Sequence, residues 1–167
     1  AEHLRVLFDQ AADAIYVCDL DGRILQTNIQ ASRGTGYSRE ELLRLNVTDI
    51  DTQQTPDRMA ALARSLGPGA IRRVDSMHRR KDGTTYPVEV MLSRIETPSG
   101  PRIMAIARDV TEQVQRKREV EEILRTTADG FWIVDDQGRF HGWNQAAADM
   151  LGYTNEEMSA LTIDQVD

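Results

Sequence analysis

The side chains best suited to chemistry in this 167-residue chain are one cysteine, Cys18, and three histidines, His3, His78 and His141. They are scattered, and no cysteine–histidine pair has the short spacing of a metal site. A nucleophilic pair would need a cysteine or serine held by a histidine, and only Cys18 with His78 merits consideration. No oxyanion-hole glycine motif or phosphate-binding loop accompanies that pair. The sequence therefore predicts neither a catalytic residue nor a metal ligand.

The charge and hydropathy of the chain restrict the classes of molecule that it is expected to bind. The net charge is −7, and the basic clusters at 72–73, 79–81 and 116–118 contain no interleaved aromatic residues. Such clusters are typical of solvated faces, so we expect no nucleic-acid partner. No stretch approaches eighteen apolar residues and no signal peptide is evident, so we expect no membrane contact in this segment. The lone Cys18 has apolar neighbours, which predicts a buried thiol and a cytoplasmic location.

A long internal repeat organises the chain. Residues 4–51 align without a gap with residues 120–167, and 13 of the 48 positions are identical. Asn28 and Asn144 are one such pair, and both copies continue to Gly-Tyr and Glu-Glu at the same spacing. An offset of 116 residues exceeds the period of a solenoid, so we interpret it as two tandem domains of one kind, of which the second is incomplete.

Periodicity and turn residues predict the elements that position these side chains. Apolar residues at Leu4, Leu7, Phe8 and Ala11 favour an amphipathic helix over residues 2–11. Asp-Gly at 21–22 and 82–83 predicts tight turns between strands, and Ser38 with Glu41 forms a capping box. The expected order is strands at 14–20 and 23–28, helices at 29–35, 39–45 and 56–66, strands at 70–80, 84–96 and 102–109, and a helix at about 110–125. This order predicts an α+β fold with helices on one side of a sheet.

These residues, in this order, resemble a PAS domain. The resemblance rests on "DLDGRILQTN", on Asn28, Ala31 and Gly36-Tyr37, on "RRKDGTTYPVEV", and on an ending, Asp109-Val110-Thr111, similar to the family's Asp-x-Thr. "ADGFWIVDDQGRFHGWNQAAADMLGYTNEEM" resembles the opening of a second such domain. The resemblance implies a PAS-like five-stranded antiparallel sheet with short helices on one face. It divides the chain into a flanking helix (1–11), a PAS domain (12–111), a helical linker (112–126) and a truncated second PAS domain (127–167).

The family pattern also sets which side of each strand faces the helices, where PAS domains hold ligands. We expect Cys18 and His78 on that side, although His78 lies four residues before a turn and is expected to be half exposed. A role for His78 in binding an anion or sensing pH is the alternative. The ligand-pocket candidates that the resemblance implies are Tyr16, Cys18, Ser76, His78, Val88, Val90, Ala105 and Ala107.

The opposite side of the sheet stays apolar where a water-facing side would alternate to polar residues. In PAS proteins this side commonly forms a dimer contact, which implies a homodimer here. A monomer in which the N-terminal helix covers its own sheet is the alternative. The residues implied for this outer face are Leu4, Phe8, Ile15, Val17, Met104 and Ile106.

The resemblance also bears on cofactors. Family members that bind flavin covalently carry a reactive cysteine after the Gly-Tyr helix, and here that place reads "LNVTDIDTQQ". Haem-binding members carry an axial histidine around the long helix, and "TPDRMAALARSLGPG" has none. We therefore expect neither haem nor covalent flavin, and the identity of any small-molecule ligand is left open.

The function that the resemblance implies is a non-catalytic sensory and dimerisation module of a larger signalling protein. Asp109 and Thr111 would relay a change in the sheet to the linker helix and onward to an effector domain. By family habit that effector is a histidine kinase of a two-component system or a cyclic-dinucleotide enzyme such as a diguanylate cyclase. The alternatives are a ligand-free spacer that sets dimer geometry and a redox sensor acting through Cys18.

Overall fold

The computed structural model describes residues 2–166. Ala1 and Asp167, at the ends of the predicted segments 1–11 and 127–167, lie outside the described residues. The chain divides into two compact units, residues 1–111 and residues 112–167. Within residues 2–166, no helix is both long enough and apolar enough to cross a bilayer.

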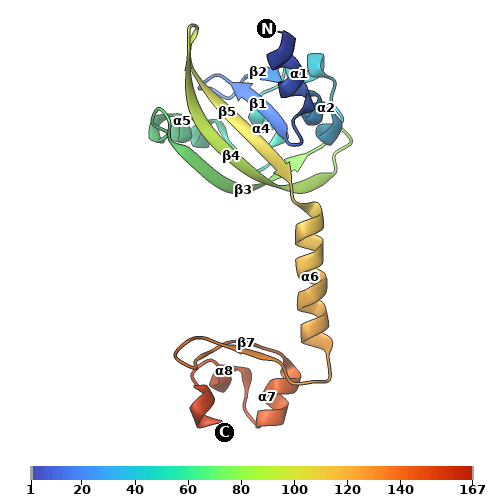
Figure 1. Cartoon of the computed structure of the whole chain (residues 1–167), viewed down its shortest axis with the longest axis vertical. Coiled ribbons are helices and arrows are strands. Elements are labelled where there is room, and N and C mark those ends of the chain that lie inside the picture. The colour runs from blue at the N-terminus through green and yellow to red at the C-terminus, as the bar shows by residue number, and fades with distance from the viewer. Residues whose placement is uncertain (1, 167) are drawn as a thin grey trace. The chain divides into compact units, whose positions relative to one another are not determined.

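The first unit is the predicted α+β fold, a five-stranded antiparallel sheet with short helices gathered on one side (Figure 1). Its strands lie in the order β2-β1-β5-β4-β3, so the edges are β2 and β3. The elements are α1 (Glu2–Gln10), β1 (Ala14–Cys18), β2 (Ile24–Thr27), α2 (Ile29–Thr35), α3 (Arg39–Leu42), α4 (Val47–Ile50), α5 (Pro56–Ser65), β3 (Ile71–Arg79), β4 (Thr85–Thr97) and β5 (Gly100–Asp109).

Strand register explains how the sheet acquires one buried side. Tyr16 lies opposite Ala105 and Val17 lies opposite Met104, so alternate residues of β1 and β5 share a side. The side that faces the helices is buried, and the other side is only partly buried. The buried sheet residues of the main core are Tyr16, Cys18, Ile24, Tyr86, Val88, Val90, Leu92, Ile103, Ala105 and Ala107.

Side-chain caps fix the short helices between β2 and β3. Ser38 and Glu41 form the predicted capping box at α3. A second capping box, formed by Asn46 and Asp49, begins α4. The sequence did not predict this helix, because four residues are too few to show a helical apolar period. Gly36 ends α2 in the left-handed region at φ 76°, a conformation that strains any residue with a Cβ.

Helix α6 (Thr111–Thr126), all but the first residue of which belongs to the second unit, has no buried residue. A two-stranded sheet and short helices follow, and Phe140, Ala148 and Met158 form a small core against which Trp143 packs. Trp143 thus finds packing partners within its own unit. These elements are β6 (Trp132–Val134), β7 (Phe140–Trp143), α7 (Gln145–Leu151), α8 (Asn155–Met158) and the 3-10 helix Ile163–Gln165.

Candidate functional site

A cavity of about 50 Å³ lies in the core of the first unit. One water needs roughly 10–15 Å³ of such space, so the cavity has room for a few waters or one small molecule. Six of the predicted pocket residues line it: Tyr16, Cys18, His78, Val90, Ala105 and Ala107. Ser76 and Val88 are buried in the same region but do not line the cavity. The segment 47–62, which the sequence analysis did not place at the site, contributes Val47, Ile50, Asp51, Gln54, Met59 and Leu62.

His78 is buried, and the expectation of a half-exposed side chain is wrong. Only 5% of the residue is accessible to solvent. The segment after α4 runs along the edge strand β3, where Asp51 bridges to His78 and the Thr52 amide donates to the carbonyl of Met77 at 2.9 Å. His78 is close in sequence to the Asp82-Gly83 turn, but its side chain is not exposed, because residues 51–52 cover β3 at this point.

A buried carboxylate accompanies His78. Asp51 Oδ1 accepts hydrogen bonds from the Ser76 hydroxyl at 2.6 Å and the Gln53 amide at 2.9 Å. Its Oδ2 lies 3.8 Å from His78 Nε2, too far for a hydrogen bond. Burial lowers the pKa of His78 below its usual 6.5, and the negative charge of Asp51 opposes that effect only in part. His78 is therefore neutral at neutral pH.

Three polar atoms of cavity-lining residues are buried without a hydrogen-bond partner. They are the hydroxyl of Tyr16, Nδ1 of His78 and Oε1 of Gln54. Burial also raises the pKa of the Tyr16 phenol far above its ordinary value, so the hydroxyl keeps its proton. Unpartnered buried groups are rare in folded proteins, and these three belong to residues of one cavity wall.

The same burial makes Cys18 chemically inert. The thiol is 1% exposed, and desolvation raises its pKa to about 12. A thiol with this pKa is protonated at neutral pH, whereas nucleophilic and redox-sensing cysteines act as thiolates. These surroundings favour neither a nucleophilic role for Cys18 with His78 as its base nor a redox switch at Cys18.

A series of contacts runs from the cavity to the start of α6. The His78 and Tyr86 rings meet in an edge-to-face arrangement, with centroids 5.9 Å apart, and the Arg80 guanidinium carbon lies 4.0 Å from the centroid of Tyr86. Arg80 Nη2 lies 3.8 Å from Asp109 Oδ2. Asp109 Oδ1 in turn accepts hydrogen bonds from the amide, at 2.9 Å, and from the hydroxyl of Thr111. The two residues proposed as a relay thus contact each other and connect to His78 through two side chains.

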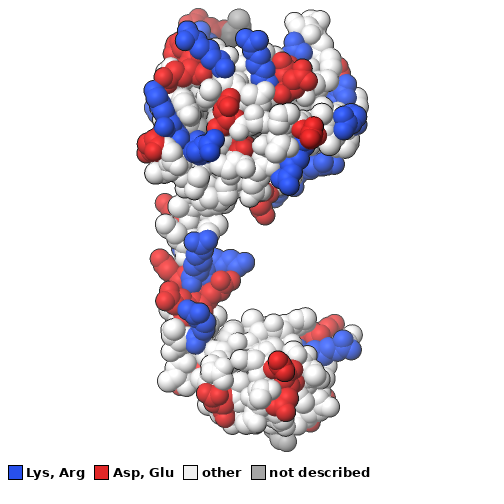
Figure 2. Space-filling model, turned by 180° about the vertical axis from the view of Figure 1, so that it is seen from behind, with Lys and Arg blue, Asp and Glu red and all other residues white. Residues whose placement is uncertain are grey.

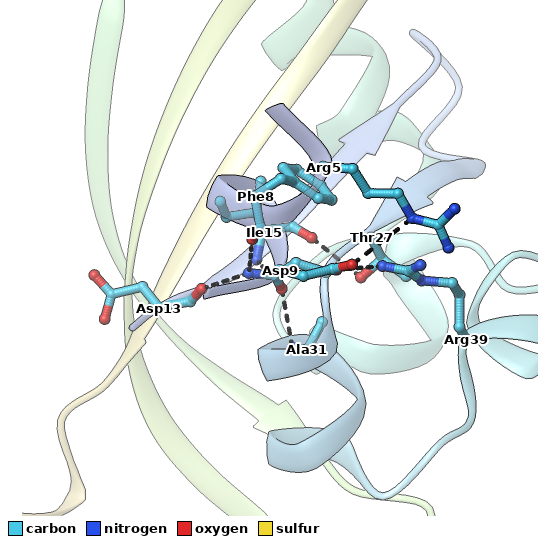
Figure 3. A network of polar contacts seen from close by, with 9 residues as sticks. Arg5, Phe8, Asp9, Asp13, Ile15, Thr27, Ala31 and Arg39 are labelled. Atoms are coloured by element: carbon cyan, nitrogen blue, oxygen red, sulfur yellow. Dashed lines mark hydrogen bonds and ion pairs between the residues drawn. The ribbon is translucent and has the colours of Figure 1, made fainter. Parts of the chain in front are cut away.

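The flanking helix α1 is bound to the domain by Asn28, which also caps α2. Its Oδ1 accepts from the amides of Ile15 (3.0 Å) and Ala31 (3.1 Å). Its Nδ2 donates to the carbonyls of Phe8 (3.1 Å) and Asp13 (3.0 Å). Figure 3 shows these four partners, which come from α1, from the connection between α1 and β1, from β1 and from α2. The identity of Asn28 and Asn144 in the repeat is the sequence signal that could have revealed this role.

An ion pair adds to the attachment of α1. Arg39, at the start of α3, donates to Asp9 Oδ1, and Arg5 lies 3.9 Å from the other carboxylate oxygen (Figure 3). Helix α1 packs against α2, and most of its apolar side chains remain exposed. Leu4, for example, is 72% exposed, whereas Phe8 is partly buried.

The outer side of the sheet is not closed by α1. Ile15, Val17, Met104 and Ile106 are all partly buried, and each retains accessible surface. Within residues 2–111, the N-terminal helix therefore does not completely cover the outer side of the sheet, as the monomer alternative requires.

Basic residues on the first unit are interspersed with acidic ones. Figure 2 shows blue and red side chains mixed over the visible face. Several cationic groups of the basic clusters have acidic neighbours, as in Lys81–Glu41 (2.7 Å) and Arg73–Glu89 (3.8 Å). This distribution agrees with solvated faces rather than a nucleic-acid surface.

Comparison with known proteins gives family matches in both units. Residues 12–112 match the family described as "PAS domain", and residues 118–164 match the one described as "PAS fold". The first unit resembles the solved PAS domain of an HTR-like protein from Haloarcula marismortui, with a TM-score of 0.62 and 29% identity over 65% of this chain and 89% of that one.

Two of the curated relatives are a sensor protein and a sensor histidine kinase. The chain is 26% identical to the sensor protein FixL of Bradyrhizobium diazoefficiens over 72% of its length and 25% of FixL. It is 27% identical to the sensor histidine kinase TmoS of Ectopseudomonas mendocina over 71% of its length and 13% of TmoS. The chain thus spans a quarter or less of either relative.

Proposed function

This chain belongs to the PAS domain family, and on that premise we propose that it is the sensory and dimerising module of a larger signalling protein. A small molecule would occupy the cavity in the first unit and favour one of two conformations of the sheet. Asp109 and Thr111 would pass that preference to α6. No catalytic step is assigned to the segment, because its cysteine is a buried thiol of raised pKa and its His78 is neutral.

The observation that carries this proposal is the series His78–Tyr86–Arg80–Asp109–Thr111, which joins the cavity wall to the first residue of α6. Each residue of the series contacts the next one. A movement of one side chain therefore changes the contact that its neighbour makes. A ligand that moves the His78 ring would move Tyr86, and with it the guanidinium that lies over Tyr86. Coupling through contiguous packed and charged groups is a physical route by which a core site acts on a helix.

We propose that self-association through the outer side of the sheet serves the same function. Ile15, Val17, Met104 and Ile106 form an apolar surface that α1 leaves partly exposed, and α1 itself presents apolar side chains such as Leu4 to solvent. We propose that a second copy of the chain covers this surface. In such a homodimer a change in the two sheets would act on both α6 helices together.

The second unit and the relatives suggest where the signal goes. We propose that residues 127–167 begin a second PAS domain, in keeping with the family match over residues 118–164. The similarity to a sensor histidine kinase favours a kinase over a cyclic-dinucleotide enzyme as the effector.

The chemistry of the cavity bears on cofactors. Covalent attachment of flavin requires a reactive thiol, and burial raises the pKa of Cys18 to about 12. Segment 47–62 contributes no histidine to the cavity wall, so an axial haem ligand would have to be His78. We propose that the ligand is neither haem nor a covalently bound flavin.

A ligand-free spacer that sets only dimer geometry is the second candidate. The volume of about 50 Å³ favours it, because drug-sized ligands occupy sites of roughly 300–1,000 Å³. Native mass spectrometry of the full chain, purified without denaturation, separates the two. A bound small molecule, or a thermal shift with a fraction of cell extract, supports sensing. An empty dimer with no thermal shift across the fractions supports the spacer.

A further inference from the structure

The three unpartnered atoms at the cavity specify the ligand that would complete it. The hydroxyl of Tyr16, Nδ1 of His78 and Oε1 of Gln54 each lose their hydrogen bonds to water on burial and gain none from the protein. Tyr16 and His78 are 3% and 5% exposed, so bulk water does not compensate. A ligand that satisfied all three would recover hydrogen bonds that the empty protein leaves unmade.

The hydrogen-bonding character of the three atoms is complementary to a donor-rich ligand. His78 is neutral, and the negative charge of the Asp51 carboxylate, 3.8 Å from Nε2, favours the tautomer with its proton on Nε2, which we assign on that electrostatic ground. Nδ1 is then an acceptor, as is the amide oxygen of Gln54. The hydroxyl of Tyr16 keeps its proton and donates. The site therefore offers two acceptors and one donor.

The charge of the cavity wall excludes an anion. Among the residues that line the cavity there is no lysine or arginine, and Asp51 contributes a carboxylate. A negatively charged ligand would meet that carboxylate in a poorly solvated space with no cation to neutralise it. The expectation that His78 binds an anionic molecule is not supported by this wall.

We propose that the cavity binds a small uncharged molecule that carries N–H donors beside a carbonyl acceptor on an apolar body, as a primary carboxamide does. The NH₂ group would donate to His78 Nδ1 and Gln54 Oε1, and the carbonyl would accept from Tyr16. The apolar body would lie against Val90, Leu92, Ile103 and Ala105, which line the same wall. This inference rests on the proposed sensory function and names the ligand class of that site.

Two sets of matched probes test the class on the full chain by ¹H–¹⁵N NMR titration. Acetamide, acetone and acetate share one shape, as do propionamide, 2-butanone and propionate, and both sets are smaller than benzene, which needs a cavity of roughly 150 Å³. We expect at least one amide to give saturable shifts at Tyr16, Gln54 and His78. Its ketone should bind about 10-fold more weakly, because it lacks donors, and its carboxylate should not bind. A ketone or carboxylate that binds as tightly as its amide overturns the proposal, as does the failure of both amides to bind.

A conservative variant separates ligand contact from a structural role. Tyr16→Phe removes an unpartnered hydroxyl, so it should raise the thermal midpoint of the free protein while weakening amide binding about 10-fold. Tyr37→Phe, which alters a core-packing ring that does not line the cavity, is the matched control and should leave amide affinity unchanged. Equal amide affinity of Tyr16→Phe and the parent would overturn the assignment.

Native mass spectrometry distinguishes failure of the class from failure of the sensory function. A co-purified carboxylic acid or hydrocarbon would refute the ligand class and leave the sensory function standing. An empty chain that responds to neither the probes nor cell extract would refute both.

Discussion

Asn28 and Asn144 bind equivalent backbone groups in the two units. Asn28 donates to the carbonyls of residues 8 and 13, and Asn144 donates to those of residues 124 and 129. Each Oδ1 accepts from a backbone amide within one residue of the start of the first strand, at 15 or 131. It also accepts from the amide of the third residue of the capped helix, at 31 or 147. In each unit, the asparagine therefore binds a carbonyl of the helix that precedes the first strand, which is α1 in the first unit and α6 in the second.

This attachment predicts the effect of Asn28→Asp. The substitution keeps the acceptor but replaces the donor NH₂ with a carboxylate oxygen that faces two carbonyls in a buried site. We expect the free energy of unfolding of the first unit to fall by about 3 kcal/mol, because two hydrogen bonds are lost and a charge is buried. Urea unfolding measures this loss, and hydrogen exchange should show faster exchange in α1.

Asn46→Asp is the matched control for that substitution. Asn46 is a partly exposed cap, and a carboxylate at the start of α4 keeps the capping acceptor. The free energy of unfolding should change by less than about 1 kcal/mol. Unchanged exchange of α1 in Asn28→Asp would contradict the role assigned to Asn28.

Local sequence signals predicted much of the fold and little of the site's polar structure. The strands, the Ser38–Glu41 box and the buried side of the sheet follow from alternation, turn residues and the family pattern, which act over a few residues. The burial of His78 and the reach of Asn28 to Phe8 depend on segments 20 or more residues away in sequence. Periodicity carries no information on which distant segment covers a strand, so those contacts required the fold.

The pH dependence of stability should report the burial of His78. The groups around it are the Asp51 carboxylate and the rings of Tyr16 and Tyr86. Because its folded-state pKa lies below the unfolded value of 6.5, the unfolded chain binds the additional proton. This contribution to stability is therefore complete above pH 6.5 and is lost as the pH falls toward the folded pKa.

His78→Gln removes that contribution while leaving the background carboxylates unchanged. We expect the parent to lose more stability than His78→Gln between about pH 7.5 and pH 5.5, by roughly 1 kcal/mol. Urea unfolding at both values measures the difference. Parallel pH profiles of the two proteins would show that His78 is not held neutral by the fold.

Cys18 should be protected from thiol reagents in the native state. Burial leaves it 1% exposed and raises its pKa to about 12, so both access and the thiolate fraction are low. We expect the reaction with a disulfide reagent to be slower in native than in urea-unfolded protein by about 100-fold or more. Equal rates in the two states would revive the redox-sensor hypothesis.

Self-association should depend on the outer side of the sheet. Ile106→Glu places a charge among partly buried apolar residues, and it should weaken the dimer at least about 10-fold if a second copy covers that surface. Ala61→Glu, at an exposed position of α5 on the helix-bearing side of the first unit, is the control and should leave association unchanged. Sedimentation velocity of both variants gives the dissociation constants. A dimer that tolerates Ile106→Glu uses another surface.

The contact series from His78 to Thr111 predicts that a change at the cavity reaches α6 only while Arg80 is present. His78→Phe alters the ring that meets Tyr86, and we expect the Thr111 amide resonance to shift in response. In an Arg80→Gln background the same substitution should shift that resonance far less, because the guanidinium no longer connects Tyr86 with Asp109. Lys81→Gln, which breaks an exposed pair with Glu41 outside the series, should preserve the full response. Equal shifts in all three backgrounds would mean that the sheet itself, rather than these side chains, carries the change.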